Sequence, residues 1–180
     1  MKTCSEDFIQ DLNLIRDAAR AAGDLALAER ARGLKIWSKT GGSPVTHADM
    51  AVDTLLKDTL LGARPDYGWL SEETADSPDR LSRERIFIVD PIDGTVAYMK
   101  NTPWWCVPIA VVENGVPIAA VIHAPALDET FVATRGGGAF LNDRPITASD
   151  VATLDDASVL ADARLLEGPI WPEPWPAMRF

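Results

Sequence analysis

The sequence has few cysteines, no basic run and no long apolar segment, and each shortage excludes a class of protein. Only two of its 180 residues are cysteines, Cys4 and Cys106, and their spacing fits neither a disulfide framework nor a zinc site. Two such thiols are typical of a reducing compartment. Because the N-terminus also has no secretory pattern, we expect a cytoplasmic protein. No stretch is long and apolar enough to span a membrane.

Basic residues are scarce relative to acidic ones. Lys and Arg number 17 against 27 Asp and Glu, which gives a formal net charge of −10. Without a basic face, a nucleic acid polymer is not an expected partner. Most of the acidic excess is expected on solvated surface, although a cation-binding cluster of carboxylates would add to it. Hydrophobic residues make up 47% of the chain, which is enough for the core of one large domain or of one domain plus part of another.

Two helices are predicted in the first third of the chain. Apolar residues at helical spacing predict the first from Ser5 to about Gly33. The second begins at Thr46, which is followed three residues later by Asp49 in a pattern close to a capping box. Between residues 104 and 147, short β-prone runs alternate with turn residues, which is typical of successive antiparallel hairpins. The predicted class is therefore α+β, with two N-terminal helices packed on a mainly antiparallel sheet.

The most informative stretch is IFIVDPIDGT, from Ile86 to Thr95. Its β-branched start predicts a buried strand, which Asp90 and a proline bring to an end. A second carboxylate, Asp93, follows in the same tight loop. Gly94 allows a close backbone approach, and Thr95 offers a hydroxyl where a short helix can begin. Two carboxylates beside a helix N-terminus suit a divalent metal and a phosphate group.

Each part of this pattern also has an ordinary structural interpretation. Asp-Pro followed by Asp-Gly is common turn chemistry. The upstream pair Glu72-Glu73 would by itself be a solvated surface pair, Asp49 could serve only as a helix cap, and Thr95 could be a plain N-cap. Their occurrence together in one chain favours a functional site.

Together these blocks resemble the inositol monophosphatase family of Mg²⁺-dependent, lithium-sensitive phosphatases, which includes the 3′(2′),5′-bisphosphate nucleotidases. Residues 90–95 match the family's D-P-x-D-G-T signature, and Ser71 to Glu73 match its (G/S)-E-E block. Residues 44–49 look like its P-V-T-x-A-D block, and residues 136–142 are similar to its G-x-G-A-F-x-N hairpin. The four blocks occur in the family's order.

The resemblance implies a Mg²⁺-dependent phosphomonoester hydrolase that uses metal-activated water. Its substrate would be a small phosphorylated molecule, either inositol monophosphate or a 3′(2′),5′-bisphosphate nucleotide, and a homodimer is among the assemblies it allows. The implied roles are metal binding by Glu72, Asp90, the Ile92 carbonyl oxygen and Asp93, catalysis by Asp49, Thr95 and Glu72, and phosphate binding by Gly94 and Thr95.

One departure from the family concerns the last part of the chain. The family carries a Trp-Asp block whose aspartate binds metal, whereas Trp171 and Trp175 are each followed here by proline. We therefore expect a chain truncated after the N-terminal half of the αβαβα sugar-phosphatase fold. Residues 1–147 would form a metal-binding α+β domain, and residues 148–180, with a strand from Ala157 to Leu160, would start an incomplete α/β domain. The alternative function is a non-catalytic or weakly active metal-binding fragment.

Two other acidic motifs fit less well. Haloacid dehalogenase phosphatases carry a D-x-D pair whose first aspartate is a nucleophile, whereas Asp90 and Asp93 are three residues apart and no parallel βαβ pattern is expected around them. An EF-hand loop needs acids at alternate positions and a final glutamate. The apolar Ile92 and residues 96–99 do not meet that requirement.

Overall fold

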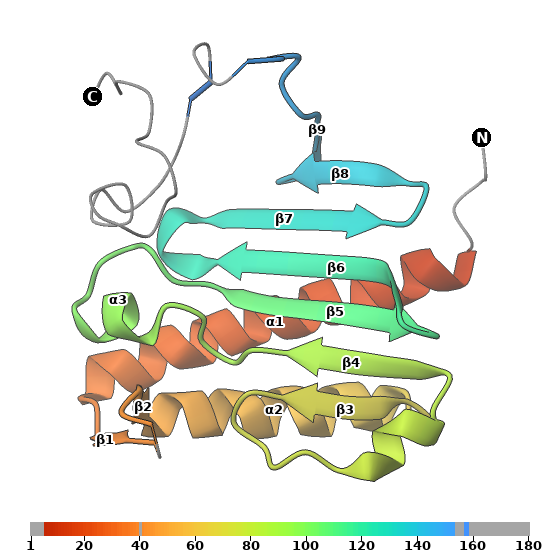
Figure 1. Ribbon diagram of the computed structural model, residues 1–180. Helices are drawn as coiled ribbons and strands as arrows, with labels where there is room; N and C mark the ends of the chain where they lie inside the picture. The colour runs from red at the N-terminus through yellow and green to blue at the C-terminus, as the bar shows by residue number, and fades with distance from the viewer. Residues whose placement is uncertain (1–5, 40, 154–156, 159–180) are drawn as a thin grey trace, which may run out of the picture. The chain divides into compact units, whose positions relative to one another are not determined.

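The computed structural model describes residues 6–39, 41–153 and 157–158 and divides the chain into two units, residues 1–146 and 147–180 (Figure 1). In the second unit, residues 147–153 and 157–158 form neither helix nor strand. Of the strand expected from Ala157 to Leu160, residues 157–158 form no strand and residues 159–160 lie outside the described residues. The start of an α/β domain at residue 148 stays a prediction.

Two long helices open the first unit. Helix α1 spans Glu6–Arg32 and α2 spans His47–Ala63, as the apolar periodicity predicted. At the start of α2, the side chains of Thr46 and Asp49 complete the predicted capping box. None of the helices in the described part of the chain is both long and apolar enough to cross a membrane.

The strands form two sheets. A small antiparallel pair, β1 (Ile36–Ser38) and β2 (Pro44–Thr46), leads into α2. The larger sheet has seven strands in the order β3 to β9, antiparallel from β4 onward, which confirms the α+β class. Its strands are β3 (Gly68–Ser71), β4 (Arg85–Val89), β5 (Val107–Glu113), β6 (Val116–Ala124), β7 (Glu129–Thr134), β8 (Gly138–Leu141) and β9 (Arg144–Ile146). Shorter helices are η1 (Pro78–Ser82), α3 (Thr95–Met99) and η2 (Pro125–Leu127).

One strand pair breaks the antiparallel pattern. Strands β3 and β4 are parallel, with Ser71 opposite Val89. The expectation that no parallel βαβ pattern surrounds Asp90 is not contradicted, because only the short 3-10 helix η1 connects β3 to β4, but the parallel pair itself was not predicted. The pair has no clear sequence signal because β3 has only four residues and its connection to β4 contains no α-helix. Parallel strands end at the same edge of a sheet, so the residues after β3 and β4 lie side by side.

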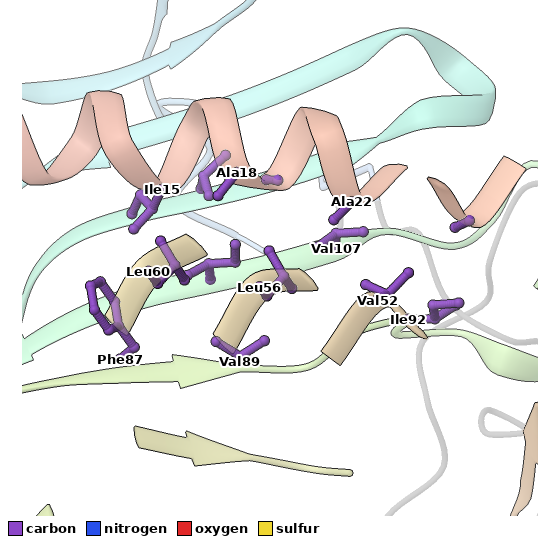
Figure 2. Close-up of a cluster of buried hydrophobic side chains, with 14 of the residues drawn as sticks. Ile15, Ala18, Ala22, Val52, Leu56, Leu60, Phe87, Val89, Ile92 and Val107 are labelled. Atoms are coloured by element: carbon purple, nitrogen blue, oxygen red, sulfur yellow. The ribbon is translucent and has the colours of Figure 1, made fainter. Parts of the chain in front are cut away.

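Helices α1 and α2 cover one face of the large sheet, and the core lies between them and the strands (Figures 1 and 2). Ile15 of α1, Leu56 of α2 and Phe87 of β4 are fully buried there. Gly23 lets α1 approach the end of β6, since a Cβ atom at this position would lie 2.5 Å from the Pro125 side chain. This packed layer supports the sheet edge at which β3 and β4 end.

Candidate active site

The loop after β4 is fixed by backbone hydrogen bonds to the start of β5. The amide of Asp90 donates to the Pro108 carbonyl at 3.2 Å, while Asp93 and Cys106 exchange two bonds of 2.9 and 3.0 Å. The Ile92 side chain is buried in the core, so only its backbone can serve a ligand. Its carbonyl oxygen accepts a hydrogen bond from the Thr95 hydroxyl at 3.2 Å.

Gly94 makes the turn from this loop into α3. Its φ of 86° lies in the left-handed region, and a Cβ atom would lie 2.7 Å from the Trp104 carbonyl oxygen. Gly94, not Thr95, is the N-cap residue of α3. The interpretation of Thr95 as a plain N-cap is therefore wrong, and its hydroxyl is instead directed to the Ile92 carbonyl.

The parallel pairing of β3 and β4 brings Glu72 to Asp90. The Glu72 amide donates to the Val89 carbonyl at 3.2 Å, and the Glu72 and Asp90 side chains are close enough for each to shift the pKa of the other. Burial, followed by the negative charges of Glu72 and Asp93, raises the pKa of Asp90 to about 7. Two sequence-predicted metal ligands therefore meet here, and Asp93 lies close enough to add its charge.

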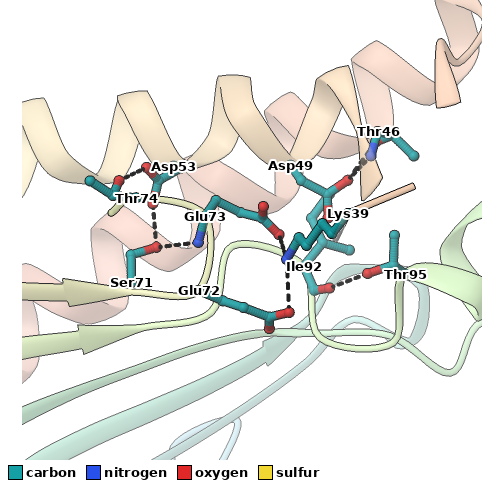
Figure 3. Close-up of polar contacts among 10 residues, drawn as sticks. All are labelled: Lys39, Thr46, Asp49, Asp53, Ser71, Glu72, Glu73, Thr74, Ile92 and Thr95. Atoms are coloured by element: carbon teal, nitrogen blue, oxygen red, sulfur yellow. Dashed lines mark hydrogen bonds and ion pairs between the residues drawn. The ribbon is translucent and has the colours of Figure 1, made fainter. Parts of the chain in front are cut away.

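Lys39 is a site residue that the sequence analysis missed. Its Nζ lies 2.9 Å from Oε1 of Glu72 and 2.6 Å from Oε1 of Glu73 (Figure 3). This ammonium group is the main reason that the pKa of Glu72 lies below its ordinary value. No motif marks Lys39 in the sequence, because it reaches the glutamates only after the β1–β2 hairpin has folded against the loop after β3.

Asp49 lies at the first turn of α2 with 1% of its surface exposed. Its Oδ2 accepts hydrogen bonds from the amide and hydroxyl of Thr46, at 2.8 and 2.6 Å. Burial raises the pKa of Asp49, and the positive charge of Lys39 opposes this rise. The negative charge of Asp49 in turn adds to the rise in the pKa of Glu73, whose main cause is burial. No hydrogen bond joins Asp49 to Thr95 within the described residues.

Two further polar side chains border the site. Asp53, one helical turn after Asp49, accepts hydrogen bonds from the hydroxyls of Ser71 and Thr74. The i,i+4 spacing of Asp49 and Asp53 places both on one face of α2 and was a usable sequence signal. Burial and then Asp93 raise the pKa of the Cys106 thiol to about 12, so it is a neutral neighbour rather than a nucleophile.

The donor set fits a hard divalent cation by its chemistry. Glu72, Asp90, Asp93 and the Ile92 carbonyl offer only oxygen atoms, which Mg²⁺ prefers. Burial, and then repulsion by Glu72 and Asp93, raises the pKa of Asp90, and a cation between the carboxylates would remove the repulsion. Among the described residues, the structure has no group of three or more His, Cys, Asp or Glu side chains placed closely enough to hold a metal ion.

Comparison with known proteins identifies the family. Residues 10–170 match the model of the inositol monophosphatase family. The chain belongs to this family. A histidinol-phosphatase of Chlorobaculum parvum is 36% identical over 151 residues, which are 83% of this chain and 58% of that protein. An inositol-1-monophosphatase of Rhizobium meliloti is 33% identical over 150 residues, which are 82% of this chain and 56% of that protein.

Solved structures of the family share this fold. The Thermotoga maritima IMPase superposes with a TM-score of 0.74 at 33% identity, covering 81% of this chain and 56% of that one. An IMPase/NADP phosphatase complexed with Mg²⁺ and phosphate has a TM-score of 0.70 at 22% identity, covering 78% of this chain and 53% of that one. The chain thus spans little more than half the length of these relatives, and it matches the N-terminal part of their fold.

Proposed function

We propose that this chain forms the metal-binding part of a Mg²⁺-dependent phosphoric monoester hydrolase that acts on a small phosphorylated molecule. One observation carries the proposal. Parallel pairing of β3 and β4 places Glu72 and Asp90 side by side at one sheet edge, where burial and then the charge of Glu72 raise the pKa of Asp90 to about 7. Carboxyl groups in which burial and like charge shift a pKa this far are typical of functional sites.

In this proposal Glu72, Asp90, Asp93 and the Ile92 carbonyl oxygen hold Mg²⁺. When bound, Mg²⁺ would supply a Lewis acid that lowers the pKa of water and neutralises charge on phosphoryl oxygens. The all-oxygen donor set supports this assignment. So does the related fold that was solved with Mg²⁺ and phosphate.

The chain's own residues have separate tasks in the proposed reaction. Asp49, Thr95 and Glu72 orient a water molecule, and Asp49 accepts its proton. Since Oδ2 of Asp49 already accepts both bonds from Thr46, Oδ1 is the atom proposed to take the proton. A raised pKa makes this carboxylate a stronger base than an exposed aspartate. The N–H groups of Gly94 and Thr95 would hold the phosphate group where the backbone turns into α3.

The substrate is proposed as a phosphate monoester of a polyol, with inositol monophosphate first and 3′(2′),5′-bisphosphate nucleotides second. Phosphate release should be measured from inositol 1-phosphate, histidinol phosphate and adenosine 3′,5′-bisphosphate, with and without Mg²⁺. We expect release that needs Mg²⁺, falls with lithium and is lost in Asp90→Asn. Equal release by wild type and Asp90→Asn would contradict the assignment of the site.

The alternative is a non-catalytic or weakly active metal-binding fragment. The chain spans 58% and 56% of the lengths of the two relatives described above, so the proposal concerns the part that carries Glu72, Asp90 and Asp93. Loss of one preorganised electrostatic contact commonly lowers a rate by about a hundredfold or more. The chain should therefore be compared with a version extended through a Trp-Asp block. Mg²⁺ binding without turnover by the shorter chain would select the alternative, whereas equal turnover by both would reject it.

A further inference from the structure

We propose that Asp53 is a positioning residue for the candidate metal centre. It holds the loop that carries Glu72 so that the Glu72 carboxylate faces Asp90. The inference rests on the proposed function, because it concerns the Mg²⁺ affinity of the same site. It adds a residue that contacts none of the proposed metal ligands.

Asp53 is hydrogen-bonded to the loop on both sides of the Glu72-Glu73 pair. Its Oδ1 accepts a hydrogen bond from the Ser71 hydroxyl, and its Oδ2 accepts one from the Thr74 hydroxyl (Figure 3). Ser71 directly precedes the Glu72-Glu73 pair, and Thr74 directly follows it. One carboxylate on α2 therefore fixes both ends of the segment that presents the glutamates.

Two backbone contacts complete the support. The Ser71 hydroxyl oxygen also accepts a hydrogen bond from the Glu73 amide at 3.3 Å. On the opposite side, the Glu72 amide donates to the Val89 carbonyl at 3.2 Å, which ties the loop to β4 directly before Asp90. The Glu72 backbone is thus held between α2 and β4, and its side chain emerges at the end of both parallel strands.

Glu72 needs this support because its own side chain is poorly packed. The Glu72 side chain is 55% exposed, whereas Asp53 is 5% exposed. An exposed glutamate side chain loses rotational freedom about several bonds when it binds a cation, which costs conformational entropy. The affinity of Glu72 for a cation therefore depends on where the backbone places its side chain. Residues that orient metal ligands commonly change metal affinity by about 10- to 100-fold when they are replaced.

The contacts of Asp53 also indicate that it positions the loop by hydrogen bonds rather than by an ion pair. In the described part of the chain, no Lys, Arg or His forms an ion pair with Asp53. A buried carboxylate without a cationic partner is retained only if hydrogen bonds satisfy its oxygens. Two hydroxyl donors, one for each oxygen, meet that need and tie the loop to α2 on both sides of the glutamate pair.

The first test compares Mg²⁺ affinity in matched variants. Asp53→Asn keeps the size of the side chain but replaces one acceptor oxygen with an NH₂ group. Asp58→Asn makes the same charge change at an exposed position of α2. Calorimetric titration with Mg²⁺, on protein shown to be folded by circular dichroism, should give about tenfold or greater weakening for Asp53→Asn and little change for Asp58→Asn. If Asp53→Asn does not fold, Ser71→Ala and Thr74→Val each remove one of the two bonds.

The second test asks whether Asp53 acts through Glu72. In a Glu72→Gln background, Asp53→Asn should weaken Mg²⁺ binding no further. In the metal-free protein, Asp53→Asn should also speed hydrogen exchange at the Glu72 and Glu73 amides. Unchanged exchange, or the same loss of affinity in both backgrounds, would overturn the positioning role. A wild-type chain that binds no Mg²⁺ would instead overturn the proposed function, and the exchange result would still report on the loop.

Discussion

Oδ2 of Asp49 accepts hydrogen bonds from both the amide and the hydroxyl of Thr46, at 2.8 and 2.6 Å. The Thr46 hydroxyl oxygen in turn accepts a bond from the Ala48 amide at 3.2 Å. These contacts close the capping box at the N-terminus of α2. Asp49 therefore stabilises the fold whether or not it also takes part in the proposed chemistry.

Asp49→Ala should lower the free energy of unfolding by about 1–2 kcal/mol, because the buried Thr46 amide loses its acceptor. Urea unfolding measures the change. Met50→Ala, at the neighbouring exposed position, is the matched control and should have a much smaller effect. Equal losses in the two variants would show that the capping box contributes nothing measurable.

Gly94→Ala should destabilise the chain for two separable reasons. A left-handed backbone costs an L-residue about 1–2 kcal/mol, and the added Cβ would lie 2.7 Å from the Trp104 carbonyl oxygen. Gly33→Ala is the control, since Gly33 has a φ of 96° but nothing within 4 Å of a Cβ atom. Thermal unfolding should therefore show a larger loss for Gly94→Ala. A larger loss for Gly33→Ala would contradict the close approach of this loop to residues before β5.

Lys39→Met should strengthen Mg²⁺ binding by a few-fold. The Lys39 ammonium group contacts both Glu72 and Glu73, and its positive charge opposes a second cation near the same carboxylates. The effect should be modest, on the order of 0.5–1 kcal/mol, because both Lys39 and Glu72 are partly solvated. Calorimetric titration of Lys39→Met and of Lys35→Met, an exposed lysine with the same charge change, measures it. Weaker binding in Lys39→Met would mean that the lysine orients the glutamates instead of competing with the cation.

Stability should fall as the pH drops below about 6.5, partly because of His123. Burial lowers the pKa of His123 from its ordinary value of 6.5; the Glu129 backbone opposes the change, Arg20 adds to it, and Asp24 and Asp128 oppose it. Below that value the unfolded chain binds a proton that the folded chain resists, so the free energy of unfolding decreases as the pH falls. Urea unfolding at about pH 7.5 and about pH 5.5 should show a smaller difference in His123→Gln than in wild type. An equal difference would assign the pH dependence to other groups.

Local chemistry predicted most of the architecture. The turn residues between 104 and 147 predicted successive hairpins, and at the turn between β5 and β6 both Asn114 and Gly115 have positive φ angles. Thr46 and Asp49 predicted the start of α2, and Asp90-Pro91 predicted the end of β4. Each of these features depends on residues that are neighbours in the sequence.

Long-range contacts were not predicted. The parallel pairing of β3 with β4, which brings Glu72 to Asp90, depends on a connection with no periodic signal. Lys39 and Asp53 reach the loop after β3 only through tertiary packing. The resemblance therefore named the metal ligands, while the groups that neutralise and position them required the structure.

The central claim is that the carboxylates around Asp90 bind Mg²⁺, and thermal unfolding with increasing Mg²⁺ tests it most directly. At a Mg²⁺ concentration a hundredfold above the dissociation constant, the wild type should gain about 2.7 kcal/mol of stability. Asp58→Asn should gain the same amount and Asp90→Asn much less. No stabilisation of the wild type by Mg²⁺, or equal stabilisation of Asp90→Asn, would contradict the account.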